Sequence, residues 1–128
     1  MQNKFLGTGH QGFHPLRKMR IALSGARYAV LHDFAVAYKV VLSAVILLWC
    51  FWYRQWIDFS IVFLATGMMM VAEIFNTTIE ALCDFLEPQE NAKIGIIKDI
   101  AAAAAGISIL VWGVTLSLEA VHVWQAMR

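Results

Sequence analysis

The chain is short, with 128 residues, of which 60% are hydrophobic and only 15% are charged. Such a length allows one domain at most, and the apolar content is well above that of a typical soluble domain. The net charge is +1, and the five basic residues that precede Asp33 lie together in one N-terminal arm. A protein that binds nucleic acid in bulk spreads basic charge over a folded surface, so this distribution argues against that class.

The first segment of interest follows residues 1–14, which are predicted to be flexible. The N-terminus lacks signal-peptide anatomy, because its apolar run is too short and starts too late. Residues 15–31 carry apolar side chains at helical spacing with arginines beside them, as is typical of an amphipathic helix on a membrane surface. The alternative is a disordered basic tail, which the regular spacing disfavours. The apolar positions are Leu16, Met19, Leu23, Ala26 and Val30.

Three membrane helices are predicted next, at residues 35–53, 57–86 and 99–121. The first and third of these helices each contain an apolar run close to the ~20 residues that a membrane crossing needs. The second begins with a shorter apolar run and continues beyond it as one helix. Lys39 is the only charge in the first span and lies near enough to its start to snorkel. A polar loop is expected at residues 85–97. The chain is therefore predicted to be a single-domain all-α membrane protein over residues 1–128.

Charge in the connecting segments predicts the orientation. The N-terminal arm carries five basic residues and the second loop carries Lys93 and Lys98, whereas the first loop offers only Arg54. By the positive-inside rule, the N-terminus and the second loop lie in the cytoplasm.

The cysteines and histidines form no pattern that indicates a metal site. Cys50 and Cys83 lie in apolar helical segments without metal-ligand spacing, and the four histidines are scattered along the chain. The two cysteines are therefore predicted to be small buried hydrophobic residues.

An acidic stripe continues the second membrane helix. Glu73, Asn76, Glu80 and Asp84 fall within an arc of about 80° when plotted at helical spacing, and the stripe is about 16 Å long. Placing ionisable groups near the hydrocarbon core of a membrane costs free energy, and such groups usually line a functional cavity. The predicted orientation opens this stripe to the cytoplasm, where ATP is available.

The acidic residues, the asparagine and the Lys98–Asp99 pair near this membrane face are the types of side chain that phosphoryl transfer requires. No P-loop, dinucleotide-binding or protein-kinase motif is present. Carboxylates are the ligands that Mg²⁺ prefers, and a lysine such as Lys98 suits phosphate oxygens. Purely structural roles are the alternative to catalysis and nucleotide binding. Glu73 could form a hydrogen bond between helices, and Asp99 could stabilise the N-terminus of a helix.

The stripe and the start of the third span resemble a known signature. The spacing Glu73-x-x-Asn76-x-x-x-Glu80, followed by Asp84 and then by Lys98-Asp99-Ile-Ala-Ala, is similar to that of the prokaryotic diacylglycerol kinase family, which includes the undecaprenol kinases. The likeness covers roughly residues 16–120. It implies an ATP- and Mg²⁺-dependent lipid kinase of the bacterial cytoplasmic membrane, generally a homotrimer with shared active sites. Diacylglycerol is the first choice of acceptor, and undecaprenol is the alternative.

The resemblance also implies roles for individual residues. Glu73 would be the general base that takes the lipid hydroxyl proton, and Asn76 would support Glu73 and the acceptor. Replacing Glu73 with glutamine is expected to abolish turnover and to leave assembly intact. Lys98, Asp99 and Arg17 would contact the nucleotide.

The metal ligands implied by the family are Glu80 and Asp33. The family carries a metal-binding glutamate eight residues after a glycine of the surface helix, and the count from Gly25 leads to Asp33. Aspartate is one methylene shorter, so that Mg²⁺ would need a small helix shift or an intervening water here.

Two other classes of protein are alternatives to a kinase. A small cation-coupled transporter would place its acid near the middle of the bilayer and usually has more than three spans. A degenerate family member that serves as a regulatory subunit is the other, and Asp33 is the only feature in its favour.

Overall fold

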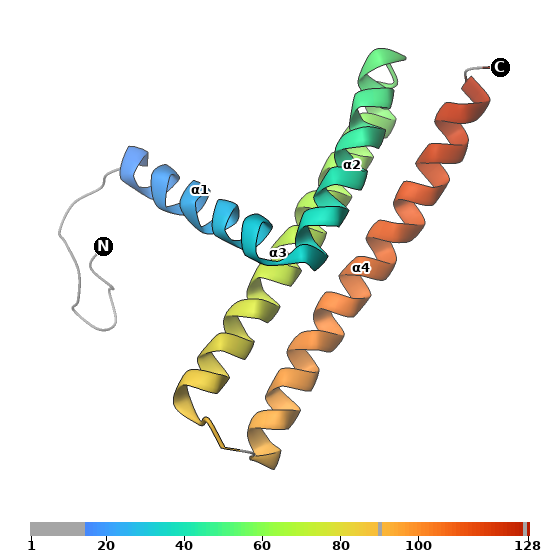
Figure 1. Ribbon diagram of the computed structural model, residues 1–128. Coiled ribbons are helices and arrows are strands. Elements are labelled where there is room, and N and C mark those ends of the chain that lie inside the picture. Colours follow the sequence, from blue (N-terminus) through green and yellow to red (C-terminus); the bar gives the residue numbers. More distant parts are fainter. Residues whose placement is uncertain (1–14, 90, 127) are drawn as a thin grey trace.

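The computed structural model describes residues 15–89, 91–126 and 128, and every element in these ranges is a helix. The helices are α1 (Pro15–His32), α2 (Phe34–Trp52), α3 (Trp56–Leu86) and α4 (Ala92–Ala126). Helices α2, α3 and α4 run side by side, and α1 projects sideways from the start of α2 (Figure 1). Residues 1–14, which the sequence predicts to be flexible, lie outside the described residues.

The three bundle helices are each long and apolar enough to cross a membrane. This finding confirms the predicted all-α class and gives three candidate membrane spans where three were predicted. Many large hydrophobic side chains on these helices are exposed, as lipid-facing positions require. At 1.5 Å per residue, α3 and α4 are about 46 and 52 Å long and exceed the ~30 Å of a hydrocarbon core. Both extend past the start of α2 at the end where they are joined (Figure 1).

Asp33 separates α1 from α2. Its backbone is extended, and its Oδ1 accepts hydrogen bonds from the backbone nitrogens of Ala35 at 2.8 Å and Val36 at 3.4 Å. An aspartate in this position caps the otherwise unpaired N–H groups of the first helical turn. The N-cap therefore fixes the point at which the chain turns from α1 into the bundle.

Helix α4 begins at Ala92 rather than at residue 99. Asn91 explains the early start, because its side chain accepts a hydrogen bond from Lys93 N at 3.0 Å and its carbonyl accepts one from Gly95 N at 2.9 Å. Glycine within a helix costs about 1 kcal/mol relative to alanine but does not end the helix once a cap is in place. The part of the predicted loop from Ala92 onward is consequently helical.

The core of the bundle lies between α2, α3 and α4. Trp112 of α4 is buried there, and its Nε1 donates a hydrogen bond to Ser43 Oγ of α2 at 2.9 Å. Both cysteines are buried and unpaired, as predicted. The buried hydrophobic cluster consists of Ile46, Cys50, Val62, Met69, Trp112, Leu116 and Val123.

Candidate active site

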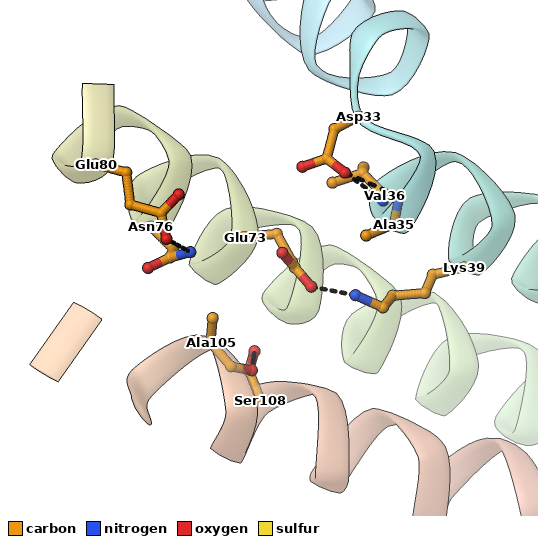
Figure 2. Close-up of polar contacts among 9 residues, drawn as sticks. All are labelled: Asp33, Ala35, Val36, Lys39, Glu73, Asn76, Glu80, Ala105 and Ser108. Carbon is orange, nitrogen blue, oxygen red and sulfur yellow. Dashed lines mark hydrogen bonds and ion pairs between the residues drawn. The ribbon is translucent and has the colours of Figure 1, made fainter. Parts of the chain in front are cut away.

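Glu73 is buried on α3 and forms an ion pair with Lys39 of α2 (Figure 2). Lys39 is only 3% exposed, and its Nζ donates a hydrogen bond to Glu73 Oε1. The expectation that Lys39 snorkels to the membrane surface is therefore wrong. The physical reason is that an opposite charge lies on the neighbouring helix at the same depth, and pairing offsets the desolvation of both groups.

Asn76 and Glu80 form a second polar contact, one turn further along α3. Asn76 Nδ2 donates a hydrogen bond to Glu80 Oε1 at 3.0 Å (Figure 2). Asn76 Oδ1 is buried and accepts no hydrogen bond from the part of the chain that the structure describes. A carboxylate beside an unsatisfied amide oxygen is a pair of hard oxygen donors, which fits the ligand preference of Mg²⁺.

Lys98 of α4 pairs with Asp84 near the end of α3. Lys98 Nζ lies 2.6 Å from Asp84 Oδ1, and both side chains are partly open to solvent. The pair lines a pocket of about 560 Å³ between the end of α3 and the start of α4. The pocket is open and carries a lysine that can reach a bound anion, whereas Asp99 is exposed beside it. This is the place in the described chain where α3 and α4 could hold a phosphate group.

Asp33 faces a different wall of α3. It lines a groove of about 950 Å³ between α1, α2 and α3, whose α3 side is formed by Ile74, Thr77, Thr78 and Ala81. Glu80 lies outside this lining, and the Asp33 Oδ1 atom is used to cap α2. The structure does not bring Asp33 and Glu80 together through a contact within one chain.

Arg17 is also separate from the rest of the predicted nucleotide site. It is exposed in the first turn of α1, at the end that points away from α4 (Figure 1). A single chain therefore places Lys98 and Asp99 together but leaves Arg17 apart from them.

Lys39 is the residue of the site that the sequence analysis missed. A partial signal was present, because Lys39 is the only charged residue of α2 and Glu73 is the charged residue of α3 that lies nearest to its depth, counted from the short connection between the two helices. Two antiparallel helices joined by a short turn place such positions at the same depth. Depth makes the pair a candidate, but only the packed helices show that the two side chains face each other.

Comparison with known proteins gives one positive finding. The sequence model of the prokaryotic diacylglycerol kinase family matches residues 20–118, which include all the stripe residues as well as Lys98 and Asp99. No individual curated protein and no solved structure matches the chain at a significant level.

Proposed function

This chain belongs to the prokaryotic diacylglycerol kinase family, a family of membrane lipid kinases, and on that premise we propose that it phosphorylates diacylglycerol to phosphatidic acid with ATP. The observation that carries the proposal is the row of Glu73, Asn76 and Glu80 on α3, with Glu73 buried against a lysine. The family assignment displaces the alternative of a cation-coupled transporter.

Glu73 is proposed to act as the general base. It would accept the proton of the lipid hydroxyl as the oxygen attacks the γ-phosphorus of ATP, while the bond from phosphorus to the bridging oxygen of ADP breaks. Lys39 holds the Glu73 carboxylate in place through its ion pair, and Asn76 would orient the hydroxyl. Phosphoryl transfer depends mainly on positioning and on charge neutralisation.

Mg²⁺ is proposed to be held by Glu80, with Asp33 as a second ligand. The fit rests on the Glu80 carboxylate and on the adjacent Asn76 oxygen, which is buried and accepts no hydrogen bond within the described chain. When bound, the ion would neutralise charge on the β- and γ-phosphates. The Asp33 cap uses Oδ1 for both of its hydrogen bonds, so that Oδ2 takes no part in capping.

Lys98, Asp99 and Arg17 are proposed to contact the nucleotide. Lys98 would exchange Asp84 for phosphate oxygens, because an exposed ion pair contributes little and breaks easily. Asp99 would reach a ribose hydroxyl or orient Lys98.

The proposed setting is the bacterial cytoplasmic membrane, with the N-terminus and the second loop in the cytoplasm and α1 on the membrane surface. A homotrimer with shared active sites is also proposed. It is supported by the separation of Asp33 from Glu80 and of Arg17 from Lys98 within one chain, which a neighbouring copy would remedy.

The experiment that tests the proposal is phosphate transfer from labelled ATP in mixed micelles with Mg²⁺, run in parallel on diacylglycerol and undecaprenol. Transfer to diacylglycerol alone supports the proposal, and transfer to undecaprenol alone replaces the acceptor. Transfer to neither alcohol by well-assembled protein contradicts the proposal. Restoration by Asp33→Glu would then identify a regulatory family member inactivated at that position.

A further inference from the structure

Three ionisable side chains meet at the end of the bundle opposite the α3–α4 loop. Asp58 lies in the first turn of α3, while Glu119 and His122 lie one turn apart near the end of α4. His122 Nδ1 lies 3.1 Å from Asp58 Oδ2 and 4.0 Å from Glu119 Oε2. In the sequence His122 is one of four scattered histidines, but the structure brings it beside two carboxylates. The proposed kinase site uses none of these residues, because Glu73 lies about 22 Å further along α3 at 1.5 Å per residue.

One oxygen of each carboxylate is buried without a hydrogen-bond donor among the described residues. The Asp58 side chain is 8% exposed, and both Asp58 Oδ2 and Glu119 Oε2 accept no hydrogen bond from the residues that the structure describes. His122 is close enough to Asp58 for an ion pair, yet no hydrogen bond joins them. Carboxylate oxygens buried without a partner are costly, so that a cation between them would satisfy both oxygens at once.

The spacing of the three groups matches the first coordination shell of a metal ion. One ligand atom from each residue lies within 4.8 Å of the others. Ligands that lie about 2.0–2.2 Å from Zn²⁺ in a tetrahedral site are roughly 3.3–3.6 Å apart, between the two spacings measured here. The Glu119-x-x-His122 spacing is one that helical bundles use to direct a glutamate and a histidine at the same metal.

We propose that Asp58, Glu119 and His122 bind a divalent transition-metal ion of the Zn²⁺ class and so fix the start of α3 to the end of α4. One imidazole nitrogen with two carboxylate oxygens suits Zn²⁺ and its neighbours better than Mg²⁺, which prefers an all-oxygen shell. The His122 side chain is largely exposed, which gives the ion a route in and leaves a coordination position for water. The inference is independent of the proposed kinase activity.

The test is a titration of the full-length, chelator-treated protein in micelles with Co²⁺, followed by visible absorption. With Mg²⁺ in excess to fill the proposed Glu80 site, we expect one saturable Co²⁺ site per chain, without the strong charge-transfer band of a thiolate ligand. His122→Ala and Asp58→Asn should each weaken Co²⁺ binding at least about tenfold, since each removes one of three protein ligands. His32→Ala, which removes a histidine from α1, and Glu80→Gln, which alters the proposed Mg²⁺ site, are matched controls and should bind Co²⁺ as the wild type does.

Thermal unfolding gives a second measurement. Zn²⁺ should raise the Tm of the wild type and of Glu80→Gln but not that of His122→Ala, because only a ligand that binds the folded state stabilises it. His122 is exposed, so its replacement should not disturb packing. Equal Co²⁺ affinity in the wild type and in the His122 and Asp58 variants would overturn the proposal, as would the absence of saturable binding to folded wild-type protein. In either case the three residues form only a polar cluster.

Discussion

Within the described residues, the Lys39–Glu73 and Lys98–Asp84 pairs each join two helices, and they differ in exposure. The Lys39 and Glu73 side chains are 4% and 8% exposed, whereas those of Lys98 and Asp84 are 35% and 65% exposed. The first pair lies between α2 and α3 inside the bundle, and the second lines a pocket beside the α3–α4 loop.

The difference indicates separate roles for the same chemistry. A buried pair cannot lose one member cheaply, because the other is left as an unpaired charge away from water. An exposed pair is worth about 0–1 kcal/mol and can be exchanged for another partner. Lys39 is therefore suited to hold Glu73 in a fixed position, and Lys98 is suited to leave Asp84 when a phosphate binds.

Glu73→Gln should have the largest effect of the substitutions considered. Turnover should fall by about 10²–10⁴-fold, the usual contribution of a general base. The ion pair also changes the expectation that assembly stays intact, because glutamine leaves the Lys39 charge buried without its counter-charge. Transfer assays and thermal unfolding of the same preparation would measure both effects.

The double variant Lys39→Met/Glu73→Gln separates these two effects. It removes both charges together, so we expect stability to recover towards that of the wild type while turnover stays as low as in Glu73→Gln. Recovery of turnover along with stability would mean that Glu73 serves the fold and is not the base.

Lys39→Met should come second in size. Removing one member of a buried pair costs about 3–5 kcal/mol of stability, and a Glu73 carboxylate without its lysine is no longer held in place. Turnover should fall, but less than in Glu73→Gln, because the carboxylate remains. Lys39→Arg keeps the positive charge and is the matched control; unfolding in denaturant and single-turnover rates would compare the two. A Met variant as stable as the wild type would contradict the buried pair.

Lys98→Met tests the exposed pair. If Lys98 contacts phosphate, the KM for ATP should rise about 10–100-fold, as expected from the loss of a charged hydrogen bond worth about 1.5–3 kcal/mol. Stability should change by no more than about 1 kcal/mol, because the lost ion pair is exposed. Initial rates at varied ATP concentration would measure the effect.

Asp84→Asn is the control for that experiment, since it breaks the same ion pair but keeps the lysine. Its KM for ATP should stay within a few-fold of the wild-type value. An equal rise of KM in Asp84→Asn and Lys98→Met would show that the two residues act as a unit, against the exchange of partners proposed here.

The fold was largely predictable because hydropathy is a property of single segments. The apolar runs of α2, α3 and α4 are long enough to specify three spans, and Asp84 lies on the same uninterrupted helix as Glu73 because no glycine or proline intervenes. The start of α4 was not predicted, because one side chain, Asn91, caps the helix ahead of a glycine that suggested a loop.

The arrangement of the candidate site was predictable along one helix but not between helices. Helical periodicity places Glu73, Asn76 and Glu80 on one face of α3, but it contains no information on which residue of α2 or α4 faces them. The pairing of Lys39 with Glu73 and the cluster of Asp58 with His122 both depend on helix rotation and register. Such contacts require the packed bundle.

Substitutions of Asp33 should have the smallest effect on stability and activity. They separate two roles of one residue, because Asp33 caps α2 and is also a proposed Mg²⁺ ligand. Asparagine caps helices as well as aspartate, so Asp33→Asn should change stability by only a few tenths of a kcal/mol, whereas Asp33→Ala should cost about 1 kcal/mol. If Asp33 is also a metal ligand, Asp33→Asn should still raise the Mg²⁺ concentration needed for half-maximal activity several-fold, because the amide carries no charge. An unchanged Mg²⁺ requirement in the Asn variant, together with lost stability in the Ala variant, would assign Asp33 to the helix cap alone and leave Glu80 as the carboxylate ligand.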